Sequence, residues 1–350
     1  MVERKMEKSM EEMDLEYIAN SDLEWSKYKN KTIFVTGATG LIGSLLVKAF
    51  AYYNCLHQGN IKIIGLIRNE EKAKRIYGKW YNNYGIHLMI GDIEQIPVIA
   101  GDVDYIFHTV SITASKMMVQ HPVLTIQTSY MGTKNVLDLA VDKKIEGMVY
   151  VSSMEVYGIP DEKKEYITEK DLGYIELENV RSSYSEGKRI CNAYAAEFGL
   201  PVKSARLAQT FGAGVLQEDN RVYAQFARSA MKKENLVLRT DGSSEGNYCY
   251  TRDVIRALLL LGYSGKVGEA YNVVNEKSHM TIREMAELVA NDVSNGEIKV
   301  EFDIPDEAKS LGYAPKVKMH LSSEKLNKLG WKAEVDMKEA YLRMMNDMEA

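Results

Sequence analysis

The sequence predicts an α/β protein: a doubly wound parallel β-sheet with helices on both faces, followed by a smaller mixed α/β lobe. Through the first two thirds of the 350 residues, short apolar runs alternate with longer stretches of helical periodicity. This alternation is the pattern of consecutive βαβ units, whose right-handed crossovers place helices on both sides of a sheet. After about Arg206 the alternation degrades and glycines cluster. A chain of this length also favours two lobes over one core.

The elements follow from the local patterns. Each predicted strand is a short, apolar run rich in β-branched or aromatic residues, and these runs lie at 32–36, 61–67, 86–90, 103–108, 148–151 and 202–207. Helical periodicity predicts helices over 41–52, 123–141 and 182–198. We therefore expect a helical extension over 1–30, a sheet domain over 31–205 and a smaller lobe over 206–350, with segments near 250–275 returning to the sheet domain. The extension carries a narrow apolar stripe, so we expect it to pack against one edge of the protein or against a second copy.

Composition and charge exclude several classes of protein. There are 44 Lys and Arg against 49 Asp and Glu, and a mildly acidic chain lacks the electrostatic footprint of a nucleic-acid binder. No apolar run is long enough to span a membrane. Three widely spaced cysteines without a Cys-x-x-Cys pair, and histidines without a His-x-x-x-His pair, predict neither disulfides nor a metal site. The charged first 30 residues do not resemble a secretory signal. We expect a cytoplasmic protein.

A glycine-rich turn joins the first predicted strand to the first predicted helix. It reads Gly37-Ala38-Thr39-Gly40-Leu41-Ile42-Gly43, with the spacing G-x-x-G-x-x-G. Glycines at this spacing let the backbone turn tightly, approach a pyrophosphate and pack the helix against the sheet. The helix amino terminus presents free N–H groups to the phosphates. The turn therefore predicts a Rossmann-type dinucleotide site formed by Gly37, Thr39, Gly40, Leu41, Ile42 and Gly43.

Two later positions bear on the choice between NAD and NADP. Arg68 follows the second predicted strand, where an acidic residue would suit the ribose of NAD and an arginine the 2′-phosphate of NADP. This position favours NADP slightly, unless Arg68 is an ordinary solvated loop residue. Asp92, followed by Ile93, comes after the third predicted strand and is expected either to bind the adenine or to cap a helix.

A Tyr-x-x-x-Lys pair predicts the proton-transfer groups. On a helix, residues four apart share one face, and a nearby ammonium lowers the pKa of a phenol so that it can exchange a proton with a hydroxyl. Three pairs match: Tyr130/Lys134, Tyr166/Lys170 and Tyr184/Lys188. Ser152 and Ser153 end the fifth predicted strand, where ligands bind in such sheets. Only Tyr184 follows these hydroxyls inside a strongly predicted helix.

Taken together, these motifs resemble the extended short-chain dehydrogenases/reductases, and within them the nucleotide-sugar epimerase/dehydratase family. The resemblance rests on the glycine turn, the segment Val151-Ser-Ser-Met-Glu-Val-Tyr-Gly158 and Tyr184-x-x-x-Lys188, and it covers about residues 31–345. It implies that Ser153 supplies the catalytic hydroxyl, that Tyr184 is the base and that Lys188 is its partner. It also implies oxidation of a sugar hydroxyl, usually at C4, in a nucleoside-diphosphate sugar, and a homodimer formed through the two long helices.

Glu155 indicates which branch of this family the sequence resembles most. The run Ser153-Met154-Glu155-Val156-Tyr157-Gly158 is similar to that of UDP-glucuronate decarboxylases, whereas Met154 cannot supply the acid that a 4,6-dehydratase carries beside this glutamate. We therefore include Glu155 among the candidate catalytic residues. The alternative is a buried structural carboxylate.

One departure from the family concerns the diphosphate. The family often has an arginine where this chain has Gly246. The candidate substrate-binding residues are Arg206, Arg221 and Arg252, and Arg239 is a further cation that could compensate for the missing arginine.

Three functions are compatible with the sequence. The first is an NAD(P)-dependent epimerase or decarboxylase that works through a 4-keto sugar. The second is an NADPH-dependent carbonyl or keto-sugar reductase, which Arg68 favours. The third is a non-catalytic Rossmann-fold protein that senses dinucleotides, against which the intact set of Ser153, Tyr184 and Lys188 argues.

Overall fold

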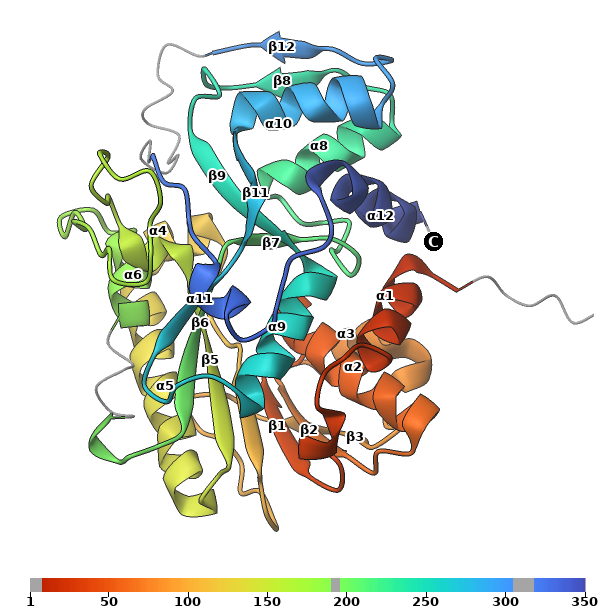
Figure 1. Cartoon of the computed structure of the whole chain (residues 1–350), viewed down its shortest axis with the longest axis vertical. Helices are drawn as coiled ribbons and strands as arrows, with labels where there is room; N and C mark the ends of the chain where they lie inside the picture. The colour runs from red at the N-terminus through yellow and green to blue at the C-terminus, as the bar shows by residue number, and fades with distance from the viewer. Residues whose placement is uncertain (1–7, 190–195, 305–317, 350) are drawn as a thin grey trace, which may run out of the picture.

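A seven-stranded parallel sheet forms the larger part of the protein. The computed structural model describes residues 8–189, 196–304 and 318–349 (Figure 1). The sheet has the order β10-β6-β5-β4-β1-β2-β3, and every neighbouring pair is parallel. Its strands are β1 Thr32–Thr36, β2 Lys62–Ile67, β3 Ile86–Ile90, β4 Tyr105–His108, β5 Gly147–Ser153, β6 Val202–Leu207 and β10 Ala270–Val273. The predicted doubly wound fold is confirmed. The seventh strand, β10, comes from the segment near 250–275 and pairs with β6.

Helices cover both faces of the sheet because successive strand residues point in opposite directions. On β1, Ile33 and Val35 pack on one face with helices α2 and α9, whereas Phe34 packs on the other face with α5. The helices are α2 Leu41–His57, α3 Glu70–Tyr77, α4 Ser115–Gln120, α5 Pro122–Lys143, α6 Ser182–Arg189 and α9 Thr251–Tyr263. The predicted helix over 182–198 includes residues 190–195, with Cys191, which lie outside the described residues.

The smaller lobe is built around a three-stranded mixed sheet. Its strands are β7 Gln209–Phe211, β9 Glu245–Tyr250 and β11 Asn275–Thr281, with β9 parallel to β7 and antiparallel to β11. A two-stranded sheet of β8 Leu236–Leu238 and β12 Val300–Phe302 lies beyond it, at the top of Figure 1. Helices α8 Val222–Met231, α10 Ile282–Leu288 and α12 Met337–Glu349 enclose a separate aromatic core around Phe211, Tyr223, Tyr248 and Tyr341.

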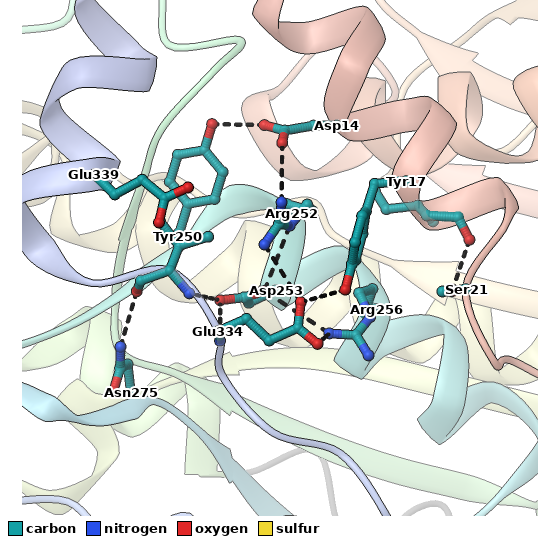
Figure 2. A network of polar contacts seen from close by, with 12 residues as sticks. Asp14, Tyr17, Ser21, Tyr250, Arg252, Asp253, Arg256, Asn275, Glu334 and Glu339 are labelled. Atoms are coloured by element: carbon teal, nitrogen blue, oxygen red, sulfur yellow. Dashed lines mark hydrogen bonds and ion pairs between the residues drawn. The ribbon is translucent and has the colours of Figure 1, made fainter.

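The amino-terminal arm joins the two lobes. Helix α1 Met10–Ala19 begins at Ser9, whose hydroxyl accepts a hydrogen bond from the Glu12 amide, and its apolar stripe is buried against α2 and α9. Asp14 accepts a hydrogen bond from the Tyr250 hydroxyl at 2.5 Å and one from Arg343 of α12 at 2.9 Å. Figure 2 shows this network, in which Arg252 of α9 lies between Asp14 and Glu334, and Arg256 of the same helix also pairs with Glu334. The arm therefore packs against the edge where the lobes meet.

Lys203 on β6 is a buried cation, and the burial of its charge destabilises the folded state. Its ammonium donates a hydrogen bond to the Gly262 carbonyl at 3.1 Å, and no carboxylate pairs with it in the described part of the chain. Burial lowers the pKa of Lys203 to about 8. In the unfolded chain the pKa of Lys203 is near 10.4. The charged lysine therefore opposes folding below pH 8, and this unfavourable effect becomes smaller as the pH rises towards 10.

We predict that Lys203→Met raises the free energy of unfolding at pH 7 by roughly 1–3 kcal/mol, because the apolar side chain removes the cost of burying the charge. The gain should shrink at pH 9.5, where wild-type Lys203 is already neutral when folded. Urea denaturation at both pH values measures it. Lys62→Met, an exposed lysine on β2, is the control. A destabilised Lys203→Met variant would contradict the prediction.

Candidate active site

The glycine turn between β1 and α2 is built to receive a dinucleotide. Gly37 has a positive φ of 65°, and a Cβ atom on Gly43 would lie only 2.2 Å from the Gly37 carbonyl oxygen. Gly40 is the residue that precedes the first turn of α2 and has no side-chain cap. The turn therefore leaves backbone N–H groups facing the space in which a pyrophosphate binds. Thr39, Leu41 and Ile42 complete the loop and are only partly buried.

The residues predicted to contact the adenosine half lie at the ends of β2 and β3, next to this turn in the sheet. Arg68 directly follows β2 and is exposed. Asp92 follows β3, and its carboxylate accepts a hydrogen bond from the Glu94 amide at 2.9 Å. The adjacent Ile93 is buried, close to Gly132 of α5. The arrangement fits a dinucleotide laid across the carboxyl ends of β1, β2 and β3.

Tyr184, Lys188 and Ser153 meet at the carboxyl end of β5. The Lys188 ammonium donates to the Val151 carbonyl at 2.8 Å and lies 5.9 Å from the centre of the Tyr184 ring. Burial and, after it, the nearby charge of Glu155 raise the pKa of Tyr184 to about 12. The hydroxyls of Ser153 and Ser111 act in the opposite direction. These residues place a buried phenol beside hydroxyl groups and a cation, which is the arrangement that proton exchange with an alcohol requires.

Glu155 lies in the short helix η3 Met154–Tyr157, which follows β5 directly. Its two carboxylate oxygens accept hydrogen bonds from Nη2 of Arg181 at 3.0 and 3.1 Å. Burial raises the pKa of Glu155, and the charge of Arg181 opposes this rise.

The other two Tyr-x-x-x-Lys pairs lie elsewhere. Tyr130 is on α5 with 45% of its surface exposed, and Tyr166 is in a loop, where its ring contacts His320 at 4.5 Å.

The candidate substrate-binding arginines have different surroundings. Buried Arg206 donates to the Tyr157 hydroxyl at 2.9 Å and to the Glu169 carbonyl at 2.7 Å. Arg252 is buried in the network under the amino-terminal arm (Figure 2). Arg221, by contrast, lies at the start of α8 with its side chain about half exposed.

The charges around Arg221 place it on the Tyr184 side of the small lobe. Burial disfavours its charge, but hydrogen bonds to Asp219 raise the pKa of Arg221. The phenols of Tyr223 and Tyr184 raise it as well. The Arg221 guanidinium is therefore close enough to the Tyr184 phenol for the two charges to interact. Arg239 pairs with Asp303 at the outer two-stranded sheet.

The structure explains why residue 246 is a glycine. A Cβ atom there would lie 2.4 Å from the Tyr248 hydroxyl, which fills the space on that side of β9. Any larger residue at this position requires Tyr248 to move.

Two residues of the site escaped the sequence analysis. Buried His108 ends β4, and its ring nitrogens lie 2.8 Å from the Thr36 hydroxyl and 3.0 Å from the Thr133 hydroxyl. Burial, assisted by the charge of Lys188, lowers the pKa of His108 to about 3, so the ring is neutral. Ser111 lies three residues further on, near the Tyr184 phenol. The sequence feature that could have identified these two residues is the set of polar side chains at His108, Thr109 and Ser111, at the end of a predicted strand.

The described residues contain no group of three or more His, Cys, Asp or Glu side chains placed to hold a metal ion. They also contain no helix that is both long and apolar enough to cross a membrane.

Comparisons with known proteins show the family to which the chain belongs. Residues 33–274 match the model of the NAD dependent epimerase/dehydratase family. The chain is 29% identical to UDP-glucuronic acid decarboxylase 6 of Arabidopsis thaliana over 335 residues, 93% of this chain and 92% of the relative. It is 28% identical to UDP-glucuronic acid decarboxylase 1 of Xenopus tropicalis, over 96% of this chain and 80% of the relative.

Solved structures share the fold. UDP-glucose 4-epimerase from Thermotoga maritima superposes with a TM-score of 0.73 at 20% identity, covering 91% of this chain and 98% of the other. UDP-glucuronic acid 4-epimerase from Bacillus cereus gives a TM-score of 0.73 at 19% identity, with coverage of 91% and 99%. With its glycine turn, seven-stranded sheet and matching family model, the chain belongs to the NAD dependent epimerase/dehydratase family.

Proposed function

We propose that this protein oxidises a nucleoside-diphosphate sugar at C4 and decarboxylates the resulting 4-keto uronate, in the manner of a UDP-glucuronate decarboxylase. The observation that carries the proposal is the meeting of Ser153, Glu155, Tyr184 and Lys188 at the carboxyl end of β5, beside the glycine turn. The names of the relatives, UDP-glucuronic acid decarboxylases, support the choice of substrate.

The first chemical step needs a base for the C4 hydroxyl. Tyr184 accepts this proton, and Lys188 stabilises the phenolate that does so. Ser153 holds the sugar oxygen between its own hydroxyl and the phenol. The bound nicotinamide supplies the hydride acceptor and later the hydride donor. Gly37, Gly40 and Gly43 hold its pyrophosphate.

The second step follows from the substrate. A C4 ketone is β to the C6 carboxylate, which is attached to C5. The C5–C6 bond can therefore break, so that C6 leaves as carbon dioxide and the electron pair of the broken bond forms an enolate across C4 and C5. A proton from solvent water adds to C5 and restores the ketone, and Tyr184 returns its proton to the C4 oxygen as C4 is reduced. If the substrate has no carboxylate, the same residues instead support epimerisation at C4.

Arg221 is the substrate-binding cation we favour for the diphosphate or sugar, because it is half exposed and faces the Tyr184 side. Arg206 and Arg252 are buried with protein partners, so we propose that they shape the small lobe and the lobe boundary around the substrate.

A second copy of the chain is the proposed partner. The amino-terminal half of α5 exposes a run of apolar side chains, with 68% of Val123, 41% of Leu124 and 42% of Ile126 accessible. Helix α6 packs beside α5. Two copies that pair these helices would cover the exposed side chains.

We predict that Tyr184→Phe lowers kcat with UDP-glucuronate on the order of 10²–10⁴-fold, because the variant keeps the ring and loses only the base. Release of carbon dioxide and formation of a UDP-pentose measure this. Tyr166→Phe, which removes the hydroxyl of another Tyr-x-x-x-Lys pair, is the control. If UDP-glucose, UDP-glucuronate and related nucleotide sugars give neither carbon dioxide, an epimer nor a keto sugar, the proposal fails. Net consumption of NADPH would favour a reductase.

We predict that the protein binds NADP at least as tightly as NAD, and that Arg68→Ala weakens NADP binding about 10-fold without changing NAD binding. The reason is that only NADP carries the 2′-phosphate that the exposed guanidinium would contact. Isothermal titration of both dinucleotides measures this. Preference for NAD in the wild type, unchanged by Arg68→Ala, would show that Arg68 is a solvated loop residue.

We predict a dimer in solution, and that the double variant Val123→Glu and Ile126→Glu makes it monomeric, because like charges would face each other across the shared helix pair. Size-exclusion chromatography with light scattering gives the mass, and circular dichroism checks that the variant stays folded. A monomeric wild-type protein at micromolar concentration would contradict the prediction.

A further inference from the structure

Arg181 is a charged residue at the edge of the candidate site. It lies one turn before Tyr184, and its carbonyl accepts a hydrogen bond from the Tyr184 amide at 3.3 Å. Its side chain is largely buried, with 15% exposed, and reaches back to η3. There a single nitrogen, Nη2, contacts both oxygens of Glu155.

This pair connects the two segments that hold the proposed reacting groups. Helix α6 carries Tyr184 and Lys188, and η3 follows Ser153 directly. The Ser153 hydroxyl accepts a hydrogen bond from the Glu155 amide at 3.2 Å. A second tie joins the same segments, because Arg189 donates to the Val156 carbonyl at 2.9 Å. Only the Arg181 tie places charges of both signs beside the phenol.

The two charges act on Tyr184 in opposite directions. The Glu155 carboxylate opposes formation of a phenolate, whereas the Arg181 guanidinium favours it. Glu155 keeps 36% of its side chain exposed, and the burial of the rest raises its pKa, which the charge of Arg181 opposes. Without Arg181, the site would hold either an unbalanced negative charge or a protonated Glu155.

We propose that Arg181 is a positioning residue: it holds Glu155 as a carboxylate against η3 and balances its charge, so that Tyr184 can take up and return the substrate proton. The inference rests on the proposed function of Tyr184 as the base. It adds that Glu155 works as an anion rather than as a proton-donating acid. It also adds that Arg181 and Glu155 act as one unit.

The charged and titratable groups around Tyr184 come from several elements of the chain. The charged or titratable side chains that act on Tyr184 are Glu155 from η3, Arg181 from the turn before α6, Lys188 from α6, and Arg221, the residue before α8. The hydroxyls of Ser111 and Ser153 complete the set. In the described part of the chain, Arg181 is the one cation with a hydrogen bond to Glu155.

The test compares Arg181→Met, Arg181→Lys, Glu155→Gln and the double variant Arg181→Met/Glu155→Gln. We expect Arg181→Met to lower kcat on the order of 10²-fold, because η3 and the phenol lose their alignment and charge balance. Its acid limb in the kcat–pH profile should move to higher pH, because Glu155 then protonates more easily. Arg181→Lys should restore part of the rate and return the limb towards the wild-type position, and the double variant should be no slower than either single one. Lys328→Met, which removes the cation of an exposed ion pair with Glu324, is the control.

A measurement without substrate separates this inference from the proposed function. Urea denaturation of the wild type, Arg181→Met, Glu155→Gln and the double variant gives the coupling between Arg181 and Glu155 at pH 7 and at pH 4. The coupling should be favourable at pH 7 and weaker at pH 4. If the coupling is present but no nucleotide sugar is turned over, the proposed function fails and the ion pair stands. If turnover is present and Arg181→Met leaves the rate and pH profile unchanged, or if the coupling is absent, Arg181 is not a positioning residue.

Discussion

Parallel pairing of β4 with both β1 and β5 is the constraint on which the rest of the site depends. Because the three strands run in the same direction, their carboxyl ends lie along one edge of the sheet. The glycine turn leaves from β1, the segment His108 to Ser111 from β4, and Ser153 and η3 from β5. Residues more than 100 positions apart thereby surround one space. Reversing any of these strands would send its functional residues to the opposite edge.

The same edge gathers groups that are costly to bury. A phenol and a carboxylate lie in surroundings that oppose their charged forms, as the raised pKa values of Tyr184 and Glu155 show, and the buried Lys188 ammonium lies beside them. The structure offsets this cost with local partners. Val151 gives a carbonyl to Lys188, Arg181 gives a guanidinium to Glu155, and two serine hydroxyls act on the phenol. His108 shows the opposite solution, since it lies buried as a neutral ring between two threonine hydroxyls.

The boundary between the lobes is stabilised by charge as well. Asp14 from the amino-terminal arm, Arg252 from α9 and Arg343 from α12 meet in one buried group, and the Tyr250 hydroxyl completes it. Burial raises the pKa of Asp14 to about 6, so this carboxylate is held charged mainly by its partners. The network fixes the position of β9 and α9, from which the small lobe faces the glycine turn. The network also buries Arg252, whose guanidinium is already paired with Asp14 and Glu334.

The sequence by itself determined the alternation of strands and helices, the glycine turn and the choice of Tyr184 among three equal motifs. These features are local: β-branched runs, the freedom of glycine and the 3.6-residue period act within a few residues, and each can be recognised without knowing the fold. Only the tertiary structure decided which arginines are already paired, that the Tyr248 hydroxyl occupies the space beside Gly246, and that Arg181 contacts Glu155. It also showed that β10 pairs with β6 and that His108 and Ser111 lie near the Tyr184 phenol and Lys188. The physical reason is that pairing and burial depend on neighbours supplied by other elements, and no local pattern specifies which charges those neighbours bring.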